Sequence, residues 1–300
     1  MRIIFMMSFV ILFFTTGPAV SQSPAGSEDN QVLLMIRADD IGMSHSVNMA
    51  LKELLDTGYP VSASVMFACP WYKEAVSILK EYENKSVGIH LTLNSEWENY
   101  RWGPVTGREA VPSLVDSEGY FHHTTGPLKE NPPDKDELEK ELRAQIERAL
   151  GSGLRIDYVD YHMGIRGIPG FIEVSEKLAE EYNIGMWGDY NTPRWDAQYA
   201  AAPEAKTDSL ISMAGLFEPG YNYLMAHVGI NDSELGAMRD MNSTGSLSAE
   251  MSEHRQGELD GLISKAFEDA LKEYNIRLVT FRDLIDDKGR EGVARFSDLE

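Results

Sequence analysis

Apolar runs of strand length alternate with segments of helical repeat along most of the chain. The runs cover residues 32–38, 61–67, 86–91, 155–161, 184–188, 222–228 and 276–281. Near-continuous apolar strands separated by helices are typical of a parallel sheet that helices cover on its outside. The pattern therefore predicts an α/β fold with a closed or nearly closed (β/α) barrel. A doubly wound open sheet is the alternative.

Three segments between these strands carry apolar side chains at the spacing of a helix. The first runs from Ser44, a residue type that caps helix starts, to Gly58, a residue type that ends helices. Residues 134–150 and 248–274 show the same repeat, and each is expected to form one helix.

Residues 95–133 differ from the rest of the chain. They contain two tryptophans, two tyrosines, several glycines and a Pro-Pro pair. We expect a long insertion over the active face of the barrel, because loops of this length are usually functional or disordered and the aromatic residues favour function. No break in composition divides residues 32–300, so they are expected to form a single domain.

The N-terminus has the layout of a secretory signal peptide. A positive charge at Arg2 precedes the apolar stretch 3–14, and small residues precede a cleavage point after Ser21. The apolar stretch is short for a membrane span, which needs ~20 residues. We therefore expect cleavage after residue 21, a polar linker over 22–31, no membrane span afterwards, and export to the periplasm or the medium. An uncleaved anchor is the alternative.

Charge and cysteine content narrow the function. The formal net charge of −21 argues against nucleic acid and anionic membrane surfaces as partners. Cys69 is the only cysteine, so no internal disulfide can form, and its apolar neighbours predict a core position. The length suits one large α/β domain. The sequence leaves open whether the protein is a homo-oligomer.

Four predicted strands end in a histidine or a carboxylate. These residues are Asp39 and Asp40, His90, Asp160 with His162, and His227. Each alone could be structural, but the carboxyl ends of barrel strands share one face, where active sites lie. One carboxylate and two neutral imidazoles form a three-ligand site for a divalent ion. Such an ion would relieve the repulsion within the Asp pair and activate a water molecule.

At these residues the sequence resembles the YdjC-like carbohydrate deacetylases, a group similar to polysaccharide deacetylases. The matching segments, in chain order, are "RADDIG", "VGIHLTLN", "VDYHMG", "LMAHVG" and "IRLVTFRDL". They extend from about residue 32 to 285. The resemblance implies a distorted TIM-like barrel with mainly parallel strands and outer helices. It also implies hydrolysis of an acetyl group, with N-acetyl as the expected type, on an amino sugar or oligosaccharide.

The resemblance also implies roles for individual residues. Asp40, His90 and His162 would bind one divalent metal ion, Zn²⁺ or Mg²⁺. Asp39 would be the general base, and His227 the general acid or a partner of the oxyanion. The partner implied is an acetylated mono- or oligosaccharide.

Two departures from the family pattern concern the site. Gly164 stands where the family has a second histidine, and Val228 stands where it has a proline after the later histidine. Trp97, Trp102 and His45 are candidate substrate contacts, since tryptophan rings can stack on sugars. The alternative for His45 is a first-turn helix residue that faces solvent.

Two other functions are compatible with the same residues. Two histidines and one carboxylate also form the metal site of non-haem Fe(II) oxygenases, although the tight H-x-D pair common there is missing. A non-catalytic exported sugar-binding barrel is the second alternative, and Gly164 is its only support.

Overall fold

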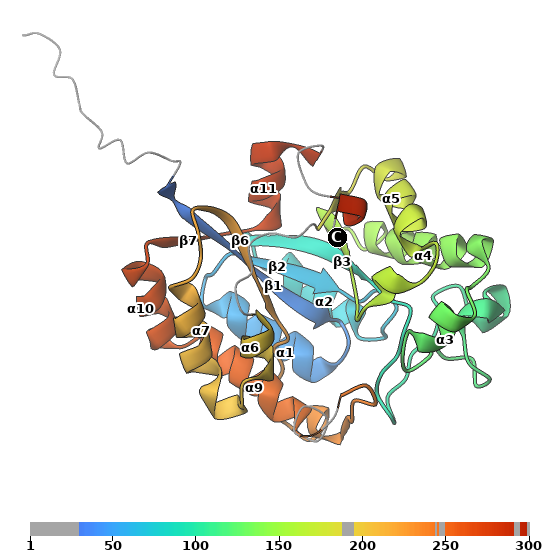
Figure 1. The fold of residues 1–300 in the computed structure, drawn as a ribbon, viewed down its shortest axis with the longest axis horizontal. Coiled ribbons are helices and arrows are strands. Elements are labelled where there is room, and N and C mark those ends of the chain that lie inside the picture. The colour runs from blue at the N-terminus through green and yellow to red at the C-terminus, as the bar shows by residue number, and fades with distance from the viewer. Residues whose placement is uncertain (1–29, 188–194, 244, 246–249, 291–294, 299–300) are drawn as a thin grey trace, which may run out of the picture.

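Seven parallel strands form a sheet that curls into a half-barrel with helices around it (Figure 1). The structure is a computed structural model that describes residues 30–187, 195–243, 245, 250–290 and 295–298. The strands are β1 (Val32–Ile41), β2 (Val61–Val65), β3 (Lys85–Leu91), β4 (Tyr158–Tyr161), β5 (Gly185–Met186), β6 (Gly220–Ala226) and β7 (Ile276–Val279). Each coincides with a predicted run. The predicted distorted TIM-like barrel is confirmed.

β1 is the centre of this sheet. The strand order is β5-β4-β3-β2-β1-β6, and β7 also pairs with β1. Along one edge, residues 32–38 of β1 pair with β6. Along the other edge, residues 32–35 of β1 pair with β7, and β1 pairs with β2 from Arg37 onward. The apolar side chains of β1 are buried on both faces of the sheet, which explains its continuous apolar run.

Helices cover the outside of the sheet. The longer ones are α1 (His45–Asp56), α2 (Tyr72–Lys80), α4 (Lys135–Leu150), α5 (Phe171–Glu181), α7 (Lys206–Ala214), α9 (Met251–Leu262), α10 (Lys265–Glu273) and α11 (Phe281–Lys288). The shorter ones are α3 (Gly126–Glu130) and α6 (Trp195–Ala200). Figure 1 shows α9, α7 and α10 on the side of the sheet opposite α5 and α11.

Two of the three predicted helices are confirmed, and the third is wrong as a single helix. α1 begins where Ser44 accepts from Val47 N, and α4 begins where Asp134 accepts from two main-chain N–H groups. The segment predicted as one helix over 248–274 is α9 followed by α10. The break occurs because the Ser264 side chain accepts from Phe267 N and caps a new helix.

The segment 95–133 is a long connection between β3 and α4, with α3 and short 3-10 turns in it. Its first residues join another part of the chain. Trp97 forms an isolated antiparallel bridge with Asp240, and Met241 N donates to Glu96 O at 2.9 Å. The predicted insertion therefore brings its N-terminal end beside residues 239–241.

The remaining predictions on chain organisation concern the termini and the cysteine. Cys69 is buried and unpaired, as expected. The predicted signal peptide lies outside the described residues. Among the helices that are described, none is both long and apolar enough for a membrane span.

Candidate metal centre and active site

A bulge at the end of β1 directs two adjacent carboxylates toward the same cavity. Consecutive residues of a regular strand point to opposite faces. Asp40 departs from this rule because its φ of 61° lies in the left-handed region, and the β1–β2 register shifts between Ala38 and Ile41. Bulges re-aim side chains and are frequent beside functional sites. As a result, Asp39 and Asp40 both line the cavity.

A buried guanidinium holds the first of these carboxylates. Arg37 Nε lies 2.7 Å from Asp39 Oδ1, and Arg37 Nη2 lies 2.8 Å from Asp39 Oδ2. The guanidinium also lies over the rings of Trp187 and Tyr223. Burial opposes its charge, but the carboxylates of Asp39 and Asp160 raise the pKa of Arg37 well above its ordinary value. The two-point contact fixes the plane of the Asp39 carboxylate.

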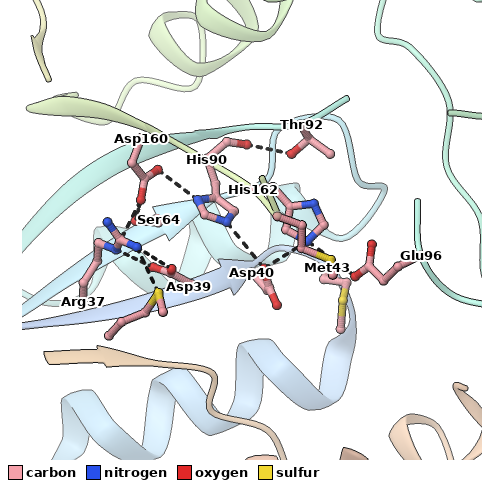
Figure 2. Close-up of polar contacts among 12 residues, drawn as sticks. Arg37, Asp39, Asp40, Met43, Ser64, His90, Thr92, Glu96, Asp160 and His162 are labelled. Carbon is pink, nitrogen blue, oxygen red and sulfur yellow. Dashed lines mark hydrogen bonds and ion pairs between the residues drawn. The ribbon is translucent and has the colours of Figure 1, made fainter. Parts of the chain in front are cut away.

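Two imidazoles face the second carboxylate, and each is held through its other ring nitrogen. His90 Nδ1 lies 2.9 Å from Asp160 Oδ1, and His162 Nδ1 lies 3.0 Å from Asn94 Oδ1. Carboxylate and amide oxygens only accept hydrogen bonds, so each Nδ1 carries a proton. Each Nε2 lies 3.6 Å from Asp40 Oδ1 (Figure 2). Histidine ligands of metal ions are oriented by outer partners of this kind.

Asp40 has one oxygen in an ion pair and one that is free to bind. Asp40 Oδ2 accepts from Arg255 Nη2 at 2.6 Å, whereas Oδ1 is buried with no hydrogen-bond partner among the described residues. Burial favours the neutral acid, but Arg255 and the nearby imidazoles hold the pKa of Asp40 well below its usual range. An ionised oxygen beside two imidazole nitrogens suits a divalent cation such as Zn²⁺. Asp40, His90 and His162 therefore fit the predicted ion.

A second group of potential ligands shares His90 with this set. Asp39, His90 and Asp160 have ligand atoms that all lie within 4.8 Å of one another. Their oxygens are already engaged, because Arg37 binds both oxygens of Asp39 and Asp160 contacts Arg37 and His90. We therefore place the candidate ion at Asp40.

The pKa values of two histidines in the site, His227 and His90, shift in opposite directions. His227 directly follows β6, and its main-chain N–H donates to Glu258 Oε2 at 2.7 Å. Burial lowers the pKa of His227 to about 4, so its imidazole is neutral at pH 7. At His90 burial also opposes the charge, but the Asp160 carboxylate outweighs it and raises the pKa to about 9. A divalent ion bound at His90 would displace the proton from Nε2, so that binding of the ion would release a proton. The ring of Tyr199 lies 5.3 Å from that of His227.

A cavity of about 490 Å³ gathers these groups at the carboxyl ends of the strands. It is lined by every predicted catalytic and metal-binding residue: Asp39, Asp40, His90, His162 and His227. Trp97 lines it too. Trp102 and His45 are not among the described residues that line the cavity. Trp102 Nε1 donates to Asn94 O. His45 pairs with Glu74, and 47 % of its side chain is exposed. Trp97 alone of these three predicted substrate contacts faces the cavity.

Sequence reasoning missed four charged residues of the cavity: Arg37, Glu96, Asp240 and Arg255. For one of them the sequence holds a signal. Arg37 precedes Asp39 by two positions, which is the spacing of one strand face. Glu96 lies beyond the end of β3, in the insertion. Arg255 lies in α9 and is placed by tertiary packing.

Gly164, the first departure from the family pattern, lines the cavity in a left-handed conformation with φ 65°. A Cβ atom there would meet nothing within 4 Å. The backbone, rather than a lack of space, therefore favours glycine. Val228, the second departure, is fully buried.

Comparison with known proteins extends this description. Residues 33–273 match the family model described as YdjC-like protein. A carbohydrate deacetylase of Brevibacillus brevis is 36 % identical over 151 residues, 50 % of this chain and 57 % of that protein. Carbohydrate deacetylases of Thermoanaerobacter pseudethanolicus and Listeria welshimeri are 27 % and 28 % identical, over 67 % and 84 % of this chain and 83 % and 99 % of theirs.

One solved structure is also similar, that of a protein from Enterococcus faecalis V583 named for cellobiose-phosphate cleavage. It has a TM-score of 0.67 and 24 % identity, and the match covers 85 % of this chain and 99 % of that one. At this level of identity the likeness concerns the fold alone.

Proposed function

Because the chain belongs to the YdjC-like protein family, we propose that it is a metal-dependent carbohydrate deacetylase. One observation carries the proposal. Asp40 Oδ1, which has no hydrogen-bond partner in the described part of the chain, lies 3.6 Å from the Nε2 atoms of both His90 and His162 inside the cavity. The relatives named carbohydrate deacetylase support the substrate class.

The residues divide into a metal-binding part and a proton-transfer part. Asp40, His90 and His162 would hold the ion, Zn²⁺ or Mg²⁺. When bound, the ion would polarise the acetyl carbonyl group and lower the pKa of a water molecule. Asp39, which Arg37 orients, would take a proton from the attacking water as general base.

His227 would act at the carbonyl oxygen or the leaving amine. In the reaction, the water oxygen bonds to the carbonyl carbon, the C–N bond breaks, and the amine takes up a proton as acetate leaves. Since the pKa of His227 is lowered to about 4, the imidazole starts neutral at pH 7. A neutral ring N–H favours hydrogen bonding to the developing oxyanion over direct proton donation.

The cavity walls support a sugar as the substrate. Its lining includes Trp97, Trp187, Tyr199 and Tyr223 together with charged groups. Aromatic faces pack on the apolar face of a sugar ring, and a few convergent polar groups fix its orientation. We propose an acetylated amino sugar or oligosaccharide.

We also propose that the protein is exported. The support is the charge, apolar stretch and small residues of positions 1–21. Mass spectrometry of the protein purified from its native host should give a chain that begins at residue 22. A chain that retains Met1 in the cytoplasm would overturn the proposal.

The decisive experiment is a screen for acetate release over acetylated glycans, chito-oligosaccharides included. We expect release from at least one glycan, loss of release with a chelator, and recovery with Zn²⁺ or Mg²⁺. Sugar binding without acetate release under any of these conditions would favour a non-catalytic binding protein. Oxygen consumption with Fe²⁺ would favour an oxygenase.

A further inference from the structure

Glu96 is a buried carboxylate that the reaction described above does not use. It lies near the start of the insertion, its side chain is 3 % exposed, and it lines the same cavity as Asp40. Glu96 Oε1 lies 3.4 Å from His162 Nε2, as Figure 2 shows. Within the described part of the chain, Glu96 Oε2 is buried and has no hydrogen-bond partner. A buried carboxylate needs a cation or several hydrogen-bond donors.

Among the described residues, no cation forms a hydrogen bond with Glu96. The charge of Arg255 acts on Glu96 through space, but the ion pair of Arg255 is with Asp40 at 2.6 Å. Because His162 Nδ1 is paired with Asn94 Oδ1, Nε2 is the ring nitrogen that faces the two carboxylates. Three acceptor groups, from Asp40, Glu96 and His162, therefore face one another.

The spacing of these acceptors matches that of ligands around one ion. Ligands arranged tetrahedrally at bond lengths of about 2.1 Å are separated by about 3.4 Å. His162 Nε2 lies 3.6 Å from Asp40 Oδ1 on one side and 3.4 Å from Glu96 Oε1 on the other. Both separations exceed a direct hydrogen bond and agree with shared coordination.

We propose that Glu96 is a fourth protein ligand of the divalent ion, beside Asp40, His90 and His162, and that the ion would keep a fifth position for water. The inference rests on the metal site of the proposed function. Two imidazoles and two carboxylates would suit Zn²⁺, Mn²⁺ or Fe²⁺ better than Mg²⁺, which prefers oxygen ligands and bound waters. Through Glu96, ion binding would tie the insertion to the sheet.

The main chain around Glu96 is held firmly enough to place a ligand. Glu96 O accepts from Met241 N at 2.9 Å, and Glu98 N donates to Arg239 O at 3.0 Å. These bonds pair the start of the insertion with residues 239–241. Glu98 itself is exposed, so it provides a matched control two positions away.

The test is a calorimetric titration of the metal-stripped protein with Zn²⁺. We expect Glu96→Gln to weaken Zn²⁺ binding by at least about 10-fold, since even outer partners of metal ligands contribute 10- to 100-fold. Glu98→Gln should bind as the wild type does. In a crystal structure of the zinc-loaded wild type, a Glu96 oxygen should lie about 2.0–2.2 Å from the ion.

Wild-type Zn²⁺ affinity in Glu96→Gln would overturn the assignment, and so would a crystal structure with both Glu96 oxygens beyond coordinating distance. An unchanged Zn²⁺ affinity with a raised KM would make Glu96 a substrate contact instead. If Glu96→Gln does not fold, the wild-type crystal structure decides. Acetate release by the wild type tests the proposed function separately, because it does not depend on which residues bind the ion.

Discussion

Arg255 Nη2 lies 2.6 Å from Asp40 Oδ2, so that the other oxygen of Asp40 faces His90 and His162. The two partners are 215 positions apart in sequence, and α9 carries the guanidinium to the end of β1. A contact to one oxygen leaves the other available and fixes the direction in which it points. Arg255 is therefore a positioning residue for the candidate metal centre.

Replacing Arg255 should loosen this carboxylate. We expect Arg255→Met to lower Zn²⁺ affinity and acetate release by about 10- to 100-fold, as for other partners of metal ligands. Arg255→Lys keeps the charge but loses the planar guanidinium group. Its Zn²⁺ affinity and acetate release should lie between those of Arg255→Met and those of the wild type. Zinc titration and turnover measure both effects. Arg239→Met, at an exposed position, is the control; wild-type behaviour of Arg255→Met in both assays would contradict the role.

Asp39 and His90 should give different losses when they are replaced. Asp39→Asn removes the proposed base, and we expect turnover to fall by about 10²- to 10⁴-fold while the ion stays bound. His90→Ala removes a ligand and should lose both the ion and turnover. Metal content after dialysis, measured together with acetate release, separates the two cases. Wild-type turnover of Asp39→Asn on every cleaved glycan would rule out its role as base.

The sequence predicts the fold well because β strands and polar strand ends leave local signals. All seven strands match apolar runs, and residues at four strand ends meet in one cavity. Parallel topology explains this success, since it carries the carboxyl ends of all strands to the same face. The break between α9 and α10 was missed because the apolar repeat continues across Ser264, whose side chain starts a new helix.

The finer arrangement of the site depends on contacts that a linear pattern does not contain. The bulge that turns Asp40 into the cavity arises from a shift in pairing between β1 and β2. Arg255 and Glu96 reach the centre from α9 and from the insertion, whose paths are set by tertiary packing. His45 follows the Asp pair in sequence, but its side chain pairs with Glu74 outside the cavity.

Stability should depend on pH through His254, a residue of α9 that is buried in the structure. Burial and the charge of Lys206 lower the pKa of His254. Their combined effect is larger than the opposing effect of the Glu258 and Glu250 carboxylates, which raise it. A histidine whose folded-state pKa is depressed stabilises the fold above its unfolded pKa of about 6.5, and this stability is lost as pH falls below that value.

The measurement is the free energy of unfolding of the wild type and of His254→Gln between pH 8 and pH 5. Relative to the variant, the wild type should lose up to about 1.4 kcal/mol per pH unit below pH 6.5. Above pH 7 the difference between the two should stay constant, which provides the internal control. A difference that is flat over the whole range would show that His254 has no depressed pKa.

A buried ion pair supports the loop that carries His227. Lys206 Nζ lies 3.1 Å from Glu258 Oε1, and Glu258 Oε2 accepts from the main-chain N–H of His227 at 2.7 Å. Lys206 also donates to the carbonyl groups of Gln198 and Tyr199. Lys206 and Glu258 are both buried, so removal of either charge leaves the other buried without its counter-charge.

We expect Lys206→Met to destabilise the fold by about 3–5 kcal/mol, the usual effect of breaking a buried pair. Lys206→Met combined with Glu258→Gln should recover part of this loss, because glutamine removes the stranded charge yet can still accept from His227 N–H. Denaturant unfolding of the single and double variants measures the coupling. The exposed pair of Lys177 and Glu139 provides the comparison, where Lys177→Met should change stability by less than about 1 kcal/mol. Equal effects of Lys206→Met and Lys177→Met would show that the buried pair does not hold this region together.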